Sequence, residues 1–318
     1  MIIVRITSGL GNQLFQYATA RSLADKHQTV LKIDRIGFVS DRQRDFRLDC
    51  FNIDIQYATL SDLIRLYPLE GIIMLLLRPL IGYKNAGRIV LWLEHHVLKL
   101  QKNYNQPFSY SKPLIKGNLL VQRFYHFDME IARSRDNLYM IGYFQSWKYF
   151  SDIRLRLLVE LQLRKPAVGQ IRGMLSRITE SESVAIHVRR GDYFSDPDNR
   201  KLFEVFDMQY FSDAIQQIRK NTEKPVFFVF SDDVRWVKRH LVSSEPLIYV
   251  ELNNADHPEE DLRLMSHCRH AILSNSSFSW WGAWLNQHPG KIVIVPQKWL
   301  NNEAYNTRDL LPPEWIHL

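Results

Sequence analysis

The second half of the chain alternates short, continuous apolar segments with amphipathic ones, and this pattern restricts the possible folds most. Apolar runs of such length are typical of strands buried on both faces of a parallel sheet. The segments between them have helical periodicity, as at 208–220, where Phe211, Ile215 and Ile218 fall on one side. We therefore expect a doubly wound α/β domain of the nucleotide-binding type. Its strands are predicted at 183–188, 225–230, 247–252, 271–273 and 291–295.

The first half of the chain opens in the same style, with a short apolar segment, a glycine-rich turn and a helical pattern. Between 60 and 103 the sequence is more helical and amphipathic. Because 318 residues exceed what one hydrophobic core usually covers, we predict two domains, 1–150 and 151–318. Both are expected to be Rossmann-like α/β domains that face a central cleft. The expected elements of the first are strands at 2–6, 29–33 and 138–142 and a helix at 13–26.

The charge of the chain narrows the possible partners without choosing among them. Lysine and arginine number 41 against 34 acidic residues, which gives a net charge of +7 and a pI near 9.3. Nucleic acid, an anionic membrane surface and a phosphorylated ligand all fit such a charge. The sequence has no zinc-finger, basic-zipper or RNA-recognition signature, so we predict no nucleic-acid partner.

Several features predict a cytoplasmic protein without a membrane span. The longest apolar stretch, 72–77, is interrupted by Arg78 and Pro79 and is too short to cross a bilayer. The chain opens with no secretory signal. Cys50 and Cys268 lie far apart and match no disulfide or metal-binding spacing, which indicates a reducing compartment.

Residues 187–193 read His-Val-Arg-Arg-Gly-Asp-Tyr and directly follow an expected buried strand. The adjacent Arg189 and Arg190 predict a compact cationic site for a diphosphate. Guanidinium groups bind phosphate oxygens in a bidentate manner and keep their charge at any working pH. The alternative is a surface ion pair between Arg190 and Asp192, because charge pairs are common at loop ends.

Residues 275–284 read Asn-Ser-Ser-Phe-Ser-Trp-Trp-Gly-Ala-Trp and follow another expected strand. Asparagine and serine here are good helix N-caps, and a helix N-terminus with free N–H groups binds anions. The aromatic side chains Phe278, Trp281 and Trp284 favour packing in the core. The ligand candidates lie at the start of the helix and are Asn275, Ser276, Ser277 and Phe278.

Two pairs of aspartates raise the question of a metal. Asp232 and Asp233 end a very apolar strand, where they could hold a metal, a base edge or a ribose. The alternative is a helix N-cap at Ser231 or Asp232. Asp196 and Asp198 have the Asp-x-Asp spacing of metal-dependent sugar transferases, but the proline between them favours an ordinary turn. No cluster of histidine and cysteine supports a transition metal. We therefore predict a site without a metal.

The turn Gly-Leu-Gly-Asn-Gln at 9–13 joins the first expected strand to the first helix. The third glycine of a dinucleotide-binding fingerprint is absent, because Phe15 and Gln16 occupy that region. Asn12 and Gln13 offer neutral donors and acceptors, which suit the hydroxyl groups of a sugar better than the charge of a phosphate.

These segments together resemble glycosyltransferase family 11, the α-1,2-fucosyltransferases. The matching motifs occur in the order of the family and cover both ends of the chain, whereas 35–135 carries no recognised motif. One departure is Ser8, where the family usually has a glycine before Gly9. The motifs lie at 9–18, 187–193, 231–233, 260–266 and 275–283.

The resemblance implies a two-domain GT-B architecture, GDP-fucose as the donor, a β-galactoside as the acceptor, inversion at the anomeric carbon and no required metal. It places Arg189 on the β-phosphate of the donor, and His187 with one of Asp232 or Asp233 on the guanosine. The remaining carried-over positions are Ser276 and Ser277, which complete the pyrophosphate site, and Asn12, which lies near fucose and acceptor.

Several alternatives stay open at this point. Asp192 is a candidate general base, or it orients an arginine while a dissociative transition state needs little base assistance. Another GDP-sugar transferase, or a non-catalytic GDP-binding protein of the membrane surface, would share many of these features. The resemblance also implies surface-polysaccharide (O-antigen) synthesis with a lipid-linked acceptor. The basic, amphipathic segment 87–103 could then dock on the cytoplasmic face of the inner membrane, or pack in the core.

Overall fold

The computed structural model describes residues 1–318 except 42, 99–111, 123–125, 191–207, 253–256 and 301–306. The chain divides into two compact units, each with its own sheet. Unit 1 comprises Met1–Gln162 and Ala304–Leu311, and unit 2 comprises Leu163–Glu303 and Pro312–Leu318. The chain therefore returns to unit 1 near its end. The predicted domains, 1–150 and 151–318, follow the same order along the chain without this return.

The sheet of unit 1 is mostly parallel, as its buried, apolar strands predict. Strands β1 and β5 lie at its centre and pair in parallel, and β2 and β4 pair in parallel with them on either side. Strand β3 is antiparallel to β4 at one edge. In spatial order the strands are β2 (Leu31–Asp34), β1 (Ile2–Arg5), β5 (Leu138–Ile141), β4 (Leu119–Val121) and β3 (Leu114–Lys116).

Helix α1 follows β1 and is buried on most of its surface, including the side chains of Gln13 and Gln16. The other helices of unit 1 are shorter, except α3. Short 3-10 turns at Ile36–Val39, Leu48–Cys50, Trp147–Tyr149 and Ser151–Ile153 complete the unit. The helices are α1 (Leu10–Lys26), α2 (Leu60–Leu66), α3 (Pro68–His96), α4 (Met129–Ala132) and α5 (Arg154–Glu160).

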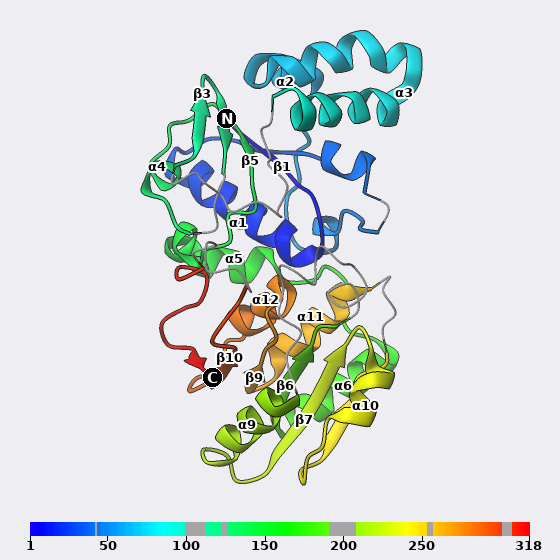
Figure 1. The fold of residues 1–318 in the computed structure, drawn as a ribbon, viewed down its shortest axis with the longest axis vertical. Helices are drawn as coiled ribbons and strands as arrows, with labels where there is room; N and C mark the ends of the chain where they lie inside the picture. Colours follow the sequence, from blue (N-terminus) through cyan, green and yellow to red (C-terminus); the bar gives the residue numbers. More distant parts are fainter. Residues whose placement is uncertain (42, 99–111, 123–125, 191–207, 253–256, 301–306) are drawn as a thin grey trace. The chain divides into compact units, whose positions relative to one another are not determined.

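Helix α3 consists of two arms that fold back on one another (Figure 1). The break is at Gly82, whose φ of 80° is open to glycine and strained for other residues. Met74 in the first arm and Ala86 and Val90 in the second pack against the turn that follows β2. The two arms therefore bury one side against unit 1 and leave the other side outward.

Asp309 anchors in unit 1 the segment through which the chain returns to that unit. Its backbone oxygen accepts a hydrogen bond from Ser146 Oγ at 2.7 Å, and its carboxylate accepts one from the Phe127 N–H at 3.2 Å. The same carboxylate forms an ion pair with Lys148. After this segment the chain enters unit 2 again and adds the edge strand β11.

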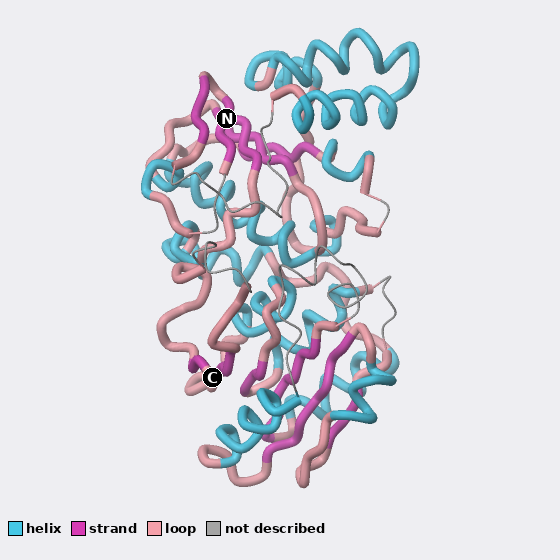
Figure 2. The backbone as a smooth tube through the Cα atoms, viewed as in Figure 1, coloured by secondary structure: helices cyan, strands magenta, loops and turns pink. Residues whose placement is uncertain are grey.

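The sheet of unit 2 is parallel throughout the described residues, and its strands other than β11 occur where the alternating pattern predicts them (Figure 2). The edge strand β11 was not predicted. Together with the sheet of unit 1, the sheet of unit 2 confirms the expectation of two Rossmann-like α/β folds. The central cleft between them stays a prediction. In spatial order the strands are β11 (Ile316–His317), β10 (Val293–Val295), β9 (His270–Ile272), β6 (Glu182–Val188), β7 (Pro225–Ser231) and β8 (Leu247–Tyr249).

Helices α9 and α10 pack on one face of this sheet through Phe211, Ile215, Ile218 and Val237. Strand addition reverses after β8, because β9 pairs with β6 instead of extending the sheet beyond β8. Right-handed crossovers then place α11 and α12 on the opposite face. The helices are α6 (Gly169–Thr179), α9 (Met208–Arg219), α10 (Val234–His240), α11 (Pro258–His267) and α12 (Ser277–Leu285).

Candidate active site

The predicted ligand residues of unit 2 lie where its strand order reverses. Strand β6 pairs with β7 on one side and with β9 on the other, so the reversal falls between β6 and β9. Open α/β sheets bind ligands outside the carboxyl ends of the strands at such a point. The loops that follow β6, β9 and β7 carry, respectively, the arginine pair, the serine-rich segment and the aspartate pair.

Ser274 joins the loops after β6 and β9. Its Oγ lies 3.1 Å from His187 Nδ1 and accepts a hydrogen bond from the Arg189 N–H at 3.2 Å. Its own N–H donates to the His187 carbonyl at 3.1 Å. Ser274 is buried and was missed by the sequence analysis, which began the motif one residue later. Its position at the end of an expected strand beside β6 is the signal that could have found it.

His187 is the next-to-last residue of β6 and is buried. Burial, and next the nearby charge of Arg189, lower the pKa of its imidazole to about 3. The ring is therefore neutral at working pH, with one nitrogen able to donate and the other to accept. Its centroid lies 5.8 Å from that of the half-buried Phe278 at the start of α12.

Arg189 and Arg190 both contact the loop after β7. Arg189 Nη1 lies 3.1 Å from Asp232 Oδ2, and the Arg190 N–H donates to Asp232 Oδ1 at 2.9 Å. Arg190 Nε lies 3.4 Å from Asp233 Oδ2. The alternative partner weighed for Arg190, Asp192, lies outside the described residues. The aspartates thus orient the two guanidinium groups from the neighbouring strand.

Asp233 and Trp236 hold Arg190 from the side of α10. The carboxylate of Asp233 caps this helix by accepting from the Trp236 N–H at 3.1 Å. The cap was expected one or two residues earlier, at Ser231 or Asp232, so that prediction was wrong in its position. The guanidinium carbon of Arg190 lies 4.1 Å from the centre of the Trp236 ring, which is a cation–π contact. The stacking and the ion pair together fix the orientation of the planar guanidinium.

The start of α12 divides the four predicted ligand residues into two kinds. Ser276 caps the helix by accepting from the Phe278 N–H at 3.3 Å, and the buried Asn275 donates to the Trp299 carbonyl at 3.0 Å. Ser277 and Phe278 are half-buried. Asn275 and Ser276 therefore shape the loop, and Ser277 and Phe278 are the more accessible pair. The expected core packing of Trp281 and Trp284 is confirmed, since both are buried.

Asn12 lies in unit 1, in the first turn of α1. Its Nδ2 donates to Ser8 Oγ at 2.9 Å, and its Oδ1 accepts from Gln145 Nε2 at 2.7 Å. Ser8 has a φ of 69°, in the left-handed region that favours glycine. This explains the glycine that the family usually has there, and the hydrogen bond to Asn12 offsets part of the strain.

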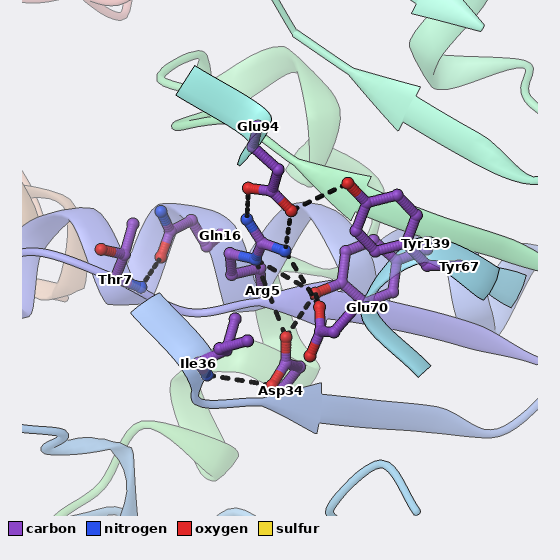
Figure 3. A network of polar contacts seen from close by, with 9 residues as sticks. All are labelled: Arg5, Thr7, Gln16, Asp34, Ile36, Tyr67, Glu70, Glu94 and Tyr139. Carbon is purple, nitrogen blue, oxygen red and sulfur yellow. Dashed lines mark hydrogen bonds and ion pairs between the residues drawn. The ribbon is translucent and has the colours of Figure 1, made fainter. Parts of the chain in front are cut away.

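A buried ionic network in unit 1 was not predicted (Figure 3). The Arg5 guanidinium donates to both oxygens of Glu94, at 2.6 and 2.9 Å, and to Glu70 Oε2 at 3.0 Å. Asp34 is 3.7 Å from Arg5 Nε. The carboxylates come from both arms of α3 and from the end of β2, so this network ties α3 to the sheet.

The contacts of Tyr139 show that one carboxyl group of this network carries a proton. Its hydroxyl contacts both Asp34 Oδ2 and Glu70 Oε2, and it accepts from Arg5 Nε at 3.1 Å. A phenol has one proton to donate, so one of the two carboxyls has to carry a proton. Burial, and next the charge of Asp34, raise the pKa of Glu70 to about 8, against the opposing charge of Arg5. Glu70 is therefore the protonated group at neutral pH.

Two observations bear on metals and membranes. Among the residues that the structure describes, no group of three or more histidine, cysteine, aspartate or glutamate side chains could hold a metal ion. Asp196 and Asp198 lie outside that part of the chain. No helix in the described ranges is long and apolar enough to cross a membrane.

Sequence comparison finds relatives along the whole chain. The model of the family described as "Glycosyl transferase family 11" matches residues 1–318. An Escherichia coli protein named alpha-1,2-colitosyltransferase is 27% identical, over 100% of this chain and 99% of that protein. The Escherichia coli O-antigen biosynthesis glycosyltransferase WbnK is 31% identical, over 98% of this chain and 99% of that protein. A mouse galactoside 2-alpha-L-fucosyltransferase is 24% identical, over 99% of this chain and 73% of that protein.

Solved structures with a similar backbone include two other sugar transferases. The fucosyltransferase NodZ from Bradyrhizobium aligns with a TM-score of 0.48 and 14% identity, over 89% of this chain and 92% of that chain. The ADP-heptose heptosyltransferase II of Escherichia coli aligns with a TM-score of 0.43 and 11% identity, over 100% of this chain and 89% of that chain.

Proposed function

We propose, from the premise that this chain belongs to glycosyl transferase family 11, that it transfers L-fucose from GDP-fucose to the 2-hydroxyl of a terminal β-galactoside. The observation that carries the proposal is the arginine pair at the strand reversal of unit 2. Arg189 and Arg190 are held there by Asp232, Asp233 and Ser274, at the edge where an α/β sheet binds its nucleotide.

The diphosphate of the donor would lie between the arginines and the start of α12. Arg189 is placed on the β-phosphate, with Arg190, Ser276, Ser277 and the N–H groups of the helix start around it. Before the donor binds, Arg189 is paired with the Asp232 carboxylate. On binding, a phosphate of the donor would take the place of this carboxylate, so Arg189 would have an anionic partner in both states. The arginines can therefore neutralise the charge that develops on the leaving diphosphate.

The guanosine would lie beside His187 and the loop after β7. A neutral imidazole can hydrogen-bond a base or a ribose but carries no charge into the site. Both aspartates use both oxygens, Asp232 on Arg189 and Arg190, and Asp233 on Arg190 and the Trp236 N–H. Asp233 is the more exposed of the two aspartates, at 37% against 25% of the side chain, so we assign the guanosine contact to Asp233. Phe278 would border the same side.

Inversion follows from one displacement. The oxygen of the acceptor 2-hydroxyl forms a bond to C1 of fucose from one side. On the other side the bond from C1 to the β-phosphate oxygen breaks, and GDP leaves with the electron pair. The hydroxyl proton passes to a base or to water. Asp192 is our candidate base, and Asn12, held by Ser8 and Gln145, is placed near fucose and acceptor.

We propose that the reaction needs no metal, because two guanidinium groups and a helix start supply the positive charge that a metal otherwise provides. Activity should then persist in a chelator. Loss of activity in chelator with recovery in Mn²⁺ would restore Asp196 and Asp198 as metal ligands.

The acceptor proposed for this enzyme is lipid-linked and is used in O-antigen synthesis at the cytoplasmic face of the inner membrane. The basic charge of the chain supports a peripheral contact with anionic lipid. The identity of the sugar next to the galactose depends on the acceptor-side loops, and an acceptor panel decides it.

One experiment tests the proposal as a whole. The protein is incubated with GDP-fucose, a panel of galactosides and a chelator, and the product linkage is determined by NMR. We expect an α-1,2-linked fucose. Tight GDP binding without transfer to any galactoside would instead favour a non-catalytic GDP-binding protein, and transfer from another GDP-sugar only would favour a different transferase.

A second donor is worth a direct comparison, because one relative is named for the transfer of colitose. Colitose lacks one hydroxyl of fucose. A site that hydrogen-bonds this hydroxyl rejects the deoxy sugar by about 10⁴-fold, whereas a site without that contact accepts both. Competition between the two GDP-sugars for one acceptor separates these cases.

A further inference from the structure

Helix α3 exposes many large apolar side chains on its two arms. In the first arm, the spacing of Ile72, Leu75, Leu76 and Leu80 places them along one helical stripe. Leu80 is 78% exposed and Leu76 is 62% exposed. The set on α3 consists of Ile72, Leu75, Leu76, Leu80, Ile81, Tyr83, Ile89 and Trp92. Soluble proteins rarely leave so many large apolar groups together without a partner.

The exposed charged side chains of α3 are all basic. Helix α3 has two acidic residues, Glu70 and Glu94, and both are buried on its inner side against Arg5. Its remaining charged side chains, Arg78, Lys84 and Arg88, are exposed. The ionic network that fixes α3 to the sheet therefore also removes every negative charge from its outer surface.

A partner for this surface has to offer apolar groups to the exposed apolar side chains and negative charge to the basic ones. A second copy of the chain fits poorly, because it would bring Arg78, Lys84 and Arg88 close to the same three charges. An anionic bilayer fits both features, since acyl chains accept the apolar groups and headgroup phosphates accept the basic ones.

The dimensions of α3 indicate how it would lie on the bilayer. Its first arm, from Pro68 to the break at Gly82, is about 21 Å long at the rise of an α-helix, which is shorter than the apolar core of a bilayer. The inner side of both arms is already packed against unit 1. The element can therefore lie in the interface but cannot cross it.

We propose that α3 is a membrane-docking element. Its exposed apolar side chains, with Leu76, Leu80 and Trp92 foremost, enter the headgroup region of an anionic phospholipid bilayer, and Arg78, Lys84 and Arg88 bind the headgroups. The proposal deepens the peripheral contact proposed above, and it shifts the docking surface from 87–103 to both arms of α3.

Vesicle flotation with the full chain tests the docking. The vesicles are phosphatidylcholine alone, or phosphatidylcholine and phosphatidylglycerol in equal parts, each at low and high salt. We expect flotation with the anionic vesicles and its loss at high salt. The triple variant R78Q/K84Q/R88Q should bind about a hundredfold more weakly, since each charge contributes about fivefold. The double variant L76Q/L80Q should bind at least about a hundredfold more weakly.

Matched controls carry the same changes on other exposed positions. R172Q/R177Q/K220Q removes three basic charges, and L155Q/V242Q replaces two side chains that are 81% and 79% exposed. Both should bind as the unchanged protein does. Equal weakening in the controls would overturn the proposal, because binding would then follow net charge or general hydrophobicity.

Insertion is measured separately through Trp92. The emission difference between the unchanged protein and W92F isolates this indole among the 8 tryptophans of the chain. We expect the difference spectrum to move to shorter wavelength on anionic vesicles and to be quenched by brominated lipid. Charge-dependent flotation without this shift would overturn the insertion. A dimer that L76Q/L80Q dissociates, with no flotation, would assign the surface to a second copy instead.

The activity assay keeps this proposal separate from the proposed function. Transfer to a water-soluble galactoside should be the same in L76Q/L80Q and in the unchanged protein, because none of these residues belongs to the candidate site. If flotation fails while this transfer persists, the docking proposal falls and the transferase stands. If flotation is as expected and no transfer occurs, the transferase proposal falls and the docking proposal stands.

Discussion

Arg189 joins three strand ends through two bonds, since its N–H binds Ser274 after β9 and its guanidinium binds Asp232 after β7. Loss of one such preorganised contact typically costs about 10²–10³ in rate. We expect Arg189→Ala to lower kcat/KM by that factor. Arg189→Lys should recover only part of it, because a lysine keeps the charge without the planar fork.

Steady-state kinetics and GDP affinity of the Arg189 variants check this expectation. Arg172→Ala removes an exposed arginine of α6 and serves as the control. Activity of Arg189→Ala within a few-fold of the unchanged enzyme would remove Arg189 from the assigned role.

Glu70 gives unit 1 a stability that depends on pH. Burial raises its folded pKa from 4.5 to about 8, so the folded state binds more protons than the unfolded state between these values. Stability is therefore highest below the unfolded pKa and falls as pH rises towards 8. We expect a loss of about 2 kcal/mol over roughly two pH units in this window.

Glu70→Gln should remove most of this slope, because an amide keeps the shape without the ionisation. Urea unfolding at several pH values measures it, with Glu130→Gln, which changes an exposed carboxyl, as the control. A slope that persists unchanged in Glu70→Gln would assign the stored proton to another group.

At the scale of elements, we expect alanine substitution at two helical glycines to change stability in opposite directions. A Cβ on Gly71 would lie 2.4 Å from the Ile64 backbone nitrogen, whereas a Cβ on Gly173 in α6 would meet nothing within 4 Å. Gly71→Ala has to push α2 away from α3 and should cost about 2 kcal/mol or more. Gly173→Ala should stabilise by about 0.5–1 kcal/mol, because alanine favours the helix. Thermal unfolding of the pair compares them directly, and equal shifts would contradict the close packing of α2 on α3.

The elements also show which sequence signals sufficed. The strands of unit 2 are short apolar runs with helical patterns between them, and all except the edge strand β11 occur where they were predicted. The switch point then places Arg189, Asp232 and Ser276 at one edge without any further information. Strands β3 and β4 were missed, because they lie in a region whose pattern is dominated by the helices beside it. The expectation for the apolar residues of 87–103 named either core packing or docking. In the described part of this segment, Val90 packs inward while Ile89 and Trp92 are exposed, and docking stays a proposal.

The Arg5 network marks the limit of such reasoning. One charged residue at the end of an apolar strand signals a buried pair, but its partners Asp34, Glu70 and Glu94 come from separate elements. Their distance along the chain gives no periodic pattern. Only the packing of α3 on the sheet brings them together.

At the scale of the molecule, the two units should respond to pH in opposite directions. His187 in unit 2 has its folded pKa lowered from 6.5 to about 3, so the unfolded state binds more protons between these values. Unit 2 therefore loses stability as pH falls below 6.5, while unit 1 gains it through Glu70. GDP at 100 times its Kd should add about 2.7 kcal/mol to unit 2.

Hydrogen exchange read by mass spectrometry assigns these changes to segments of the chain. We expect GDP to slow exchange in β6, β7 and β9 and to leave exchange in β1 and β5 unchanged. Lowering the pH from 8 towards 5 should increase the protection of the sheet of unit 1 and decrease that of the sheet of unit 2. The same change of protection in both sheets would contradict the expectation that the stability of each unit depends on its own titrating group and ligand.

The return of the chain to unit 1 at Asp309 has a consequence for the ancestry of such proteins. A protein whose halves are joined once can exchange a half by a single recombination event. Here a hybrid cut near 162 would inherit its Asp309 segment and the Ser146, Lys148 and Phe127 that hold it from different parents. New donor and acceptor pairings in this lineage should therefore arise by point substitution within intact genes, or by double exchanges that carry the short return segment along.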